Sequence, residues 1–96
     1  MSRLQLVRHA EQDLDRLTDF LLEQSPDAAA LTTELLIDGL KILKQHPRIG
    51  RSRSDGLREL VISRGKTGYV ALYRYDEIRD IARVLAIRHQ REFGNF

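Results

Sequence analysis

LRELVISRGKTGYVALYRYDEIRDIARVLAIRH, residues Leu57 to His89, is the part of the sequence that sets the architecture. It contains three runs rich in β-branched, aromatic and leucine residues, and the short segments between them carry Gly, Lys and Asp. The runs are Leu57–Arg64, Tyr69–Tyr75 and Ile81–His89. Consecutive antiparallel strands have this pattern, because strands favour bulky side chains and tight turns favour small or polar ones. The sequence therefore predicts a β-meander.

Arginine interrupts every one of these runs, at Arg58, Arg64, Arg74, Arg83 and Arg88. A guanidinium group is rarely buried without a partner, whereas an antiparallel sheet often leaves one face in contact with water. We therefore expect the sheet to place these cations near its edges or on an open face. The function of the protein therefore depends on what this cationic surface binds.

The residues before the meander predict a short strand and a helix. Arg3 to Arg8 alternates weakly between polar and apolar residues, which suits a strand at an edge of the sheet or paired with the last strand. From Ala10 onward, Leu14, Leu17 and Leu21 recur at helical spacing, so an amphipathic helix of about fourteen residues is expected. Its polar face is formed by Glu11, Asp13, Asp15, Arg16, Asp19 and Glu23.

Ser25-Pro26-Asp27 marks the start of a second helix. Ser25 is suited to cap free N–H groups, Pro26 to the first helical position, and Asp27 to the positive end of the helix dipole. This helix should run from Pro26 to about Gln45, with leucines on its apolar face. We expect Gly39 to allow close packing of the two helices.

These elements predict an α+β fold in one domain, residues 1–96, with the order β-α-α-β-β-β. A helical hairpin packs on one face of a small antiparallel sheet. The chain has no cysteine, which excludes disulfides and thiolate metal sites, and we expect neither a metal site nor a cofactor. The apolar runs are far shorter than the ~20 residues of a membrane span, and the first residues lack the apolar core of a signal peptide. We therefore expect a cytoplasmic protein.

The charges are distributed unevenly along the chain. Residues 1–45 carry five Lys or Arg against eight Asp or Glu, and residues 46–96 carry eleven against six. Most of the cations are arginines, whose guanidinium groups form bidentate pairs with carboxylate or phosphate. This favours a basic surface for such groups. The alternative is an ordinary solvated surface, on which several arginines pair with Glu59, Asp76, Glu77 or Asp80.

The segment HPRIGRSRSDG, from His46 to Gly56, has no periodicity, and Pro47 ends the preceding helix, so a loop is expected. Arg48, Arg51 and Arg53 make this loop cationic. It either clamps a phosphate backbone or the carboxylates of a partner, or it is an exposed connector whose arginines cap the carbonyls of the second helix.

His89 is the candidate for chemistry, because it ends the last predicted strand beside Arg88 and Arg91. A metal-free ribonuclease needs a base, an acid and cations that stabilise the developing charge. His89, a tyrosine and Arg58 or Arg74 are residues of the required types.

The tyrosines of the middle strand bear on this hypothesis. Alternation places Tyr69, Tyr73 and Tyr75 on one face of the strand and Arg74 on the other, so no single face of it holds all the parts. The tyrosine stripe is either core packing or a base-stacking surface. The sequence contains no Gly-rich phosphate loop, HExxH motif, nucleophile elbow or paired carboxylates.

Several short segments occur in a characteristic order along the chain. They are Ala10…Asp13-Leu14…Leu17, Ser25-Pro26-Asp27-Ala28-Ala29, Pro47-Arg48-Ile49-Gly50-Arg51, Leu57-Arg58-Glu59-Leu60, Tyr69…Tyr73-Arg74 and Val84 to Glu92. This set resembles the RelE/ParE toxins of bacterial type II toxin–antitoxin modules over nearly the whole chain. It is most similar to the ParE or plasmid-stabilisation branch, whose members carry a Pro-x-x-Gly-Arg loop, an Arg at the start of the next strand, and a His followed two residues later by Arg.

The resemblance implies a dedicated antitoxin, of the ribbon-helix-helix type, that wraps an acidic C-terminal segment around the toxin in a hetero-oligomer. The positive second half of the chain is a suitable receptor for such a segment. We therefore predict that the partner is contacted by Arg48, Arg51, Arg53, Arg58, Arg74, Arg83, Arg88 and Arg91.

The resemblance leaves two branches for the toxic activity. ParE-like members poison DNA gyrase, whereas RelE-like members cleave mRNA in the ribosome. We predict a ParE-like, non-enzymatic gyrase inhibitor, because the chain lacks the lysine-rich site and the terminal catalytic tyrosine of some RelE members. The alternative is a ribosome-dependent mRNA endonuclease that uses His89 with Arg58, Arg74 or Arg91. A third hypothesis is a toxin-like protein that only binds its partner.

Overall fold

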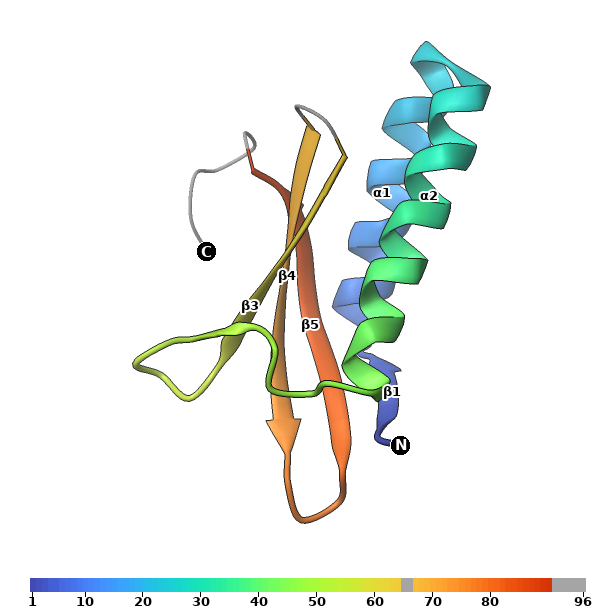
Figure 1. The fold of residues 1–96 in the computed structure, drawn as a ribbon. Coiled ribbons are helices and arrows are strands. Elements are labelled where there is room, and N and C mark those ends of the chain that lie inside the picture. The colour runs from blue at the N-terminus through green and yellow to red at the C-terminus, as the bar shows by residue number, and fades with distance from the viewer. Residues whose placement is uncertain (65–66, 91–96) are drawn as a thin grey trace.

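The computed structural model describes residues 1–64 and 67–90. Its helices are α1 (Arg8–Gln24), α2 (Pro26–Lys41) and a short 3₁₀ helix, η1 (Ile42–Lys44), and its strands are β1 (Arg3–Leu6), β2 (Arg51–Ser52), β3 (Arg58–Arg64), β4 (Thr67–Asp76) and β5 (Ile81–His89). The two long helices form a hairpin that covers one face of a five-stranded sheet (Figure 1). The predicted α+β fold, with its helical hairpin and β-meander, is confirmed.

The sheet is mixed, not purely antiparallel as predicted. Its strand order is β1-β5-β4-β3-β2. β3, β4 and β5 pair antiparallel, but β1 lies parallel to β5, with Arg3 opposite Ile81 and Leu6 opposite Val84. The antiparallel prediction was wrong for β1 because alternation within a strand fixes its faces and not its direction. The sequence predicted a position at an edge of the sheet or beside the last strand, and β1 has both.

A second difference is β2, a strand of two residues inside the predicted loop. Arg51 lies opposite Glu59 of β3, and its guanidinium donates a hydrogen bond to Glu59 Oε1 at 2.9 Å. A strand this short has no periodicity from which to predict it. The ion pair joins β2 and β3 at this point.

Capping fixes the start of α2, and a 3₁₀ turn ends the helix. The Ser25 hydroxyl accepts a hydrogen bond from the Ala28 N–H at 3.2 Å, and Pro26 occupies the first turn, as predicted. The helix ends at Lys41, earlier than the expected Gln45, because the last turn tightens into the 3₁₀ helix η1.

The core lies between the sheet and the hairpin. Tyr69, Ala71 and Tyr73 of β4 are buried, in one cluster with Leu17 of α1 and Leu36 of α2. Tyrosines at alternate positions of β4 therefore serve as core packing, which is one of the two alternatives that the sequence left open.

Gly39 brings α2 close to the sheet and not to α1. A Cβ atom at this position would lie 2.9 Å from Cγ1 of Ile62 on β3, closer than nonbonded carbon atoms approach. The expectation that Gly39 serves helix–helix packing was wrong, because the residue faces β3. Between the helices, the hydroxyl oxygens of Thr18 and Thr33 form a hydrogen bond of 3.1 Å.

Candidate functional site

The face of the sheet opposite the hairpin carries both aliphatic and cationic side chains. The register places on it Val61 of β3, Val70, Leu72 and Arg74 of β4, and Arg83 and Arg88 of β5. We call these six residues the open face. The register also places two acidic residues on this side of the sheet, Glu59 opposite Leu72 and Asp76 two residues after Arg74. Val61 is 56% exposed, and Val70 and Leu72 are partly exposed. Aliphatic side chains among arginines are typical of a protein-binding surface.

Arg74 and Arg83 lie opposite each other on β4 and β5. Arg83 donates to Gln5 Oε1 at 3.1 Å and to Asp76 Oδ2 at 3.5 Å. Arg74 is exposed, and no residue in the described part of the chain pairs with it. Asp76 offsets part of the charge of Arg83, so an anionic group bound here is stabilised mainly by Arg74.

Two arginines of the 46–56 loop are engaged by acidic side chains next to them. Arg51 pairs with Glu59 at 2.9 Å, and Arg53 lies 3.0 Å from Asp55 and 3.5 Å from Glu59. These ion pairs correspond to the solvated-surface alternative for both residues. Within the described residues, neither guanidinium group donates a hydrogen bond to a carbonyl of α2; both donate to Glu59.

Arg58 and Tyr73 together fix the backbone from Arg48 to Gly50. Arg58 Nη1 donates to the carbonyl oxygens of Gly50 at 2.8 Å and Arg48 at 3.0 Å, and the Gly50 N–H donates to the Tyr73 hydroxyl at 2.8 Å. A Cβ atom on Gly50 would lie 2.6 Å from the Tyr73 ring. Burial raises the pKa of Tyr73, against the lowering effects of the Gly50 N–H and the Arg58 charge. Arg58 is therefore engaged inside the molecule.

Arg48 contacts the end of β4 and the turn that follows it. Its guanidinium carbon lies 4.9 Å from the centroid of the Tyr75 ring, and the group pairs with Glu77. In the same region, Asp80 Oδ1 accepts hydrogen bonds from the hydroxyls of Ser2 and Tyr75, both at 2.6 Å. These two hydrogen bonds, the one from Ser2 first, hold the pKa of Asp80 below its ordinary value of 3.8.

Asp13 has a structural role that the sequence analysis missed. It was predicted on the polar face of the first helix, but it is only 8% exposed, and its Oδ2 accepts a hydrogen bond from the Ile87 N–H at 3.0 Å. Ile87 lies beyond the pair of Leu6 and Val84, the last that β1 makes with β5. Beyond the end of β1, Asp13 thus accepts a backbone hydrogen bond from β5. This bond fixes α1 to the last strand.

Among the residues that the structure describes, the predicted ribonuclease residues are not brought together. His89 lies opposite Tyr69 on the helix-covered face, and their rings meet edge to face with centroids 5.2 Å apart. Arg58 pairs with β4 four residues further along, a separation of roughly 13 Å. Arg74 belongs to the open face, and Arg91 lies outside the described residues.

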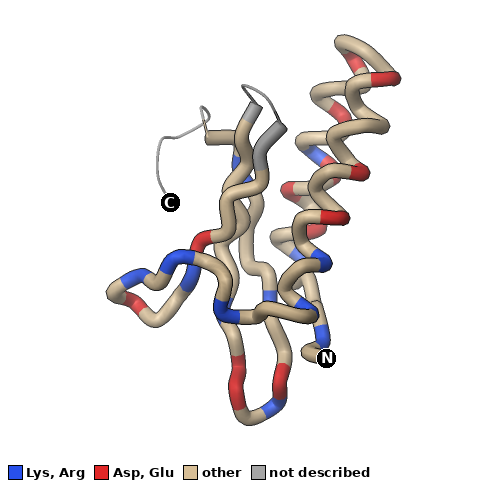
Figure 2. The backbone as a smooth tube through the Cα atoms, in the orientation of Figure 1, with Lys and Arg blue, Asp and Glu red and all other residues tan. Residues whose placement is uncertain are grey.

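Acidic residues outnumber basic ones on the helical hairpin. Figure 2 shows acidic residues along the hairpin and several basic residues on the segment that leads from α2 into the sheet. Between Arg8 and Lys41 the sequence has three Lys or Arg against eight Asp or Glu.

Within residues 1–64 and 67–90, no group of three or more His, Asp or Glu side chains is arranged to hold a metal ion. In the same part of the chain, no helix has the length and apolar character needed to cross a membrane.

Two curated proteins are similar in sequence. Toxin RelE3 of Caulobacter vibrioides is 39% identical over 93 residues, which cover 96% of this chain and 98% of that protein. Toxin RelE1 of the same organism is 40% identical over 65 residues, which cover 68% of this chain and 70% of that protein.

Two solved structures have the same fold. A chain of the chromosomal ParDE toxin–antitoxin system from P. aeruginosa superposes with a TM-score of 0.76 at 25% identity, covering 93% of this chain and 96% of that one. A chain of the RelBE2 toxin–antitoxin complex from Mycobacterium tuberculosis superposes with a TM-score of 0.60 at 25% identity, covering 92% and 96%.

A family model covers nearly the whole chain. Residues 4–93 match the model described as ParE toxin of type II toxin-antitoxin system, parDE. The resemblance drawn from the sequence motifs is confirmed, and the chain belongs to the ParE toxin family, within the RelE/ParE superfamily of type II toxin–antitoxin systems.

Proposed function

We propose that this toxin inhibits DNA gyrase by binding, without catalysis of its own. The observation that carries this proposal is the separation of those ribonuclease candidates that lie within the described residues. His89 packs against Tyr69 on the helix-covered face, whereas Arg74 belongs to the open face. Acid–base catalysis requires these groups to reach one phosphodiester. The match to the ParE toxin model supports the same branch.

The open face is the proposed receptor for the cognate antitoxin. Its aliphatic residues Val61, Val70 and Leu72 suit the apolar side of an antitoxin segment, and Arg74 and Arg83 suit its carboxylates. A ribbon-helix-helix antitoxin with an acidic C-terminal segment meets both requirements, in a cytoplasmic hetero-oligomer. Both solved neighbours come from toxin–antitoxin systems, which supports the presence of such a partner.

The other predicted arginines contribute to antitoxin binding to different extents. Arg88 belongs to the open face and contributes to the antitoxin site. Arg48, Arg51, Arg53 and Arg58 contribute less, because none of them is among the six residues of the open face and each has a partner within the toxin. Arg83 also has partners, Gln5 and Asp76, so Arg74 contributes more than Arg83 to the binding of carboxylates.

The test is supercoiling of relaxed plasmid DNA by purified gyrase. Antitoxin-free toxin should inhibit the reaction in proportion to its concentration, and adding the antitoxin should restore it. The preformed toxin–antitoxin complex is the control and should not inhibit. If toxin in excess over gyrase leaves supercoiling and DNA cleavage unchanged, the gyrase proposal fails, while binding of the antitoxin is measured separately.

Ribosome-dependent mRNA cleavage is the second candidate, because both curated relatives are named RelE toxins. Primer extension on a translated message compares wild-type toxin with His89→Ala. Circular dichroism of the variant, purified with its antitoxin, distinguishes loss of chemistry from unfolding. Cuts that appear with the wild type and vanish in the folded variant favour the ribonuclease, and absence of cuts with the wild type eliminates it.

A further inference from the structure

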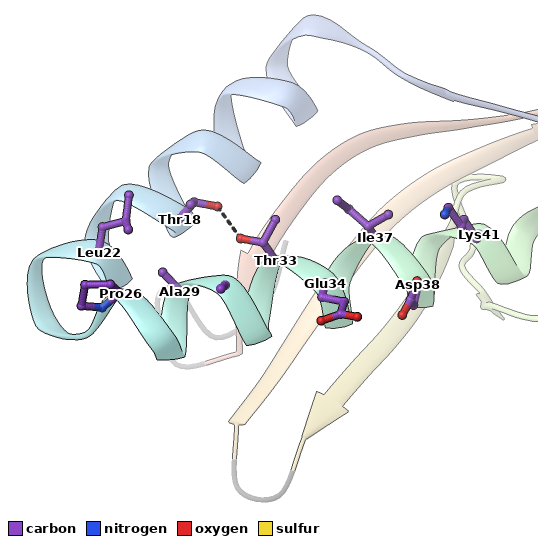
Figure 3. A pocket seen from close by; sticks show the side chains of 10 residues that line it. Thr18, Leu22, Pro26, Ala29, Thr33, Glu34, Ile37, Asp38 and Lys41 are labelled. Atoms are coloured by element: carbon purple, nitrogen blue, oxygen red, sulfur yellow. Dashed lines mark hydrogen bonds between the residues drawn. The ribbon is translucent and has the colours of Figure 1, made fainter.

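A groove of about 520 Å³ runs along the seam between α1 and α2 (Figure 3). Leu22 of α1 and Pro26 and Ile37 of α2 give it an apolar lining. Thr18 and Thr33 also line it, and their hydrogen bond joins the two helices there.

The apolar lining is turned away from the core of the toxin. Leu36 and Leu40 are the buried residues of this part of α2, and Ile37 follows Leu36 by about 100° around the helix. Leu22 and Ile37 are 48% and 40% exposed. Positions on the outer side of a helix that only meets water are ordinarily polar. Exposed apolar side chains that line a groove are typical of an interaction site.

Acidic residues flank this groove on both sides. Glu34 and Asp38 line it from α2. On α1, the groove is lined by Thr18 and Leu22. Asp15 and Asp19 each lie three residues before one of them, and therefore on the same side of the helix. Among the described residues that line the groove, Lys41 is the one cation. The groove thus has an apolar floor with predominantly negative flanks.

We propose that this groove binds an amphipathic helix of a partner protein, with apolar residues at helical spacing against the floor and Lys or Arg along both flanks. Helix-in-groove recognition uses apolar residues at i, i+3 or i+4 and i+7, and opposite charges on the flanks select the partner and speed association.

Charge excludes the two other occupants. A second copy of the chain, paired groove to groove, would bring four acidic flanks together, and the acidic segment of an antitoxin would meet the same repulsion. The hairpin lies on one side of the sheet and the open face on the other, so the basic helix and the antitoxin bind simultaneously. This inference does not depend on gyrase being the target.

The test uses the toxin–antitoxin complex and three fluorescent peptides of about 18 residues, or five helical turns. The first peptide has leucines at helical spacing and lysines on both flanks, the second has Glu in place of every Lys, and the third has the first composition scrambled. Fluorescence anisotropy measures the Kd of each. We expect the Lys peptide to bind about tenfold tighter than the other two, with an affinity that falls as salt is added.

Variants locate the binding site. Leu22→Ser combined with Ile37→Ser removes the apolar floor and should weaken binding of the Lys peptide about tenfold. Ile78→Ser is the matched control, because Ile78 is 95% exposed in the turn between β4 and β5 and should leave the Kd unchanged. Glu34→Lys with Asp38→Lys should reverse the preference toward the Glu peptide. Circular dichroism and retention of the antitoxin verify that each variant is folded.

Three outcomes overturn the proposal. The first is equal binding of the Lys and scrambled peptides, or binding that the double serine variant leaves unchanged. The second is displacement of the Lys peptide by added antitoxin. The third is a dimer, seen by sedimentation equilibrium, that the double serine variant abolishes, since this assigns the groove to a second copy of the chain.

Discussion

Replacing Asp13 with alanine tests how α1 is fixed to the sheet. Its Oδ2 accepts the Ile87 N–H at 3.0 Å in a buried position. A buried N–H left without an acceptor costs about 1–3 kcal/mol, and a hydrogen bond to a charged group contributes a similar amount. The higher helix propensity of alanine offsets about 0.5 kcal/mol. We therefore expect the free energy of unfolding to fall by about 2 kcal/mol.

Urea unfolding of the toxin, followed by far-ultraviolet circular dichroism, measures this change. A loss of about 2 kcal/mol corresponds to a decrease in Tm of about 8–16 °C for a chain of this length. Asp15→Ala is the matched control, because it removes the same charge from an exposed position of the same helix. It should change the free energy of unfolding by less than about 0.5 kcal/mol. Asp13→Asn keeps an oxygen acceptor and should fall between the two.

Equal stability of Asp13→Ala and Asp15→Ala would refute this reasoning. Amide hydrogen exchange gives an independent check at the bond itself. Exchange at Ile87 should become faster in Asp13→Ala than in Asp15→Ala, and an unchanged rate means that the carboxylate does not protect that N–H.

Three further predictions concern the other side-chain contacts. Tyr73→Phe removes the acceptor of the buried Gly50 N–H, so urea unfolding should show a loss of about 1–3 kcal/mol, and an unchanged value contradicts the role given to the hydroxyl. Asp80→Asn tests the dependence of stability on pH. Hydrogen bonds lower the pKa of Asp80 in the folded state, so the ionised carboxylate stabilises the fold above pH 3.8, the ordinary pKa. This stabilisation is lost as the pH falls through the lowered pKa. Asparagine also tolerates the positive φ of 54° at this position, so the variant should lose less stability than the wild type when acidified, and parallel losses rule the linkage out. Arg74→Glu should slow association with the antitoxin several-fold at low ionic strength, and less at high salt. Stopped-flow fluorescence measures this rate, and an equal effect of Arg8→Glu, a charge reversal on the hairpin, counts against the open face.

The elements that depend on local chemistry were predictable from the sequence. Ser25 and Pro26 predict the start of α2, because capping involves only residues within one helical turn. β3, β4 and β5 could be predicted, because the alternating side chains of each strand and the turn residues that bound it are neighbours in the sequence. The cationic character of the sheet followed from the arginines alone.

Contacts between distant parts of the chain were harder to predict. The spacing of three residues from Ala10 to Asp13 and four from Asp13 to Leu17 places the carboxylate on the buried face, but an acidic residue there is explained only by the Ile87 N–H. Likewise, the partner of Gly39 is β3, and nothing near Gly39 in the sequence identifies it. The sequence analysis assigned only arginines to the partner-binding surface. It did not predict that Val61, Val70 and Leu72 lie among them on the open face.

The pairing of the first strand with the last has a consequence for synthesis on the ribosome. The hydrogen bond between Ser2 and Asp80 joins residues 78 positions apart, and β1 finds its neighbour only when β5 has emerged. The helical hairpin is complete much earlier, but its core-facing leucines have no sheet to cover until then. Such long-range closure is the slow part of folding. A chain interrupted before Ile81 lacks β5 and its arginines, and therefore cannot form the open face.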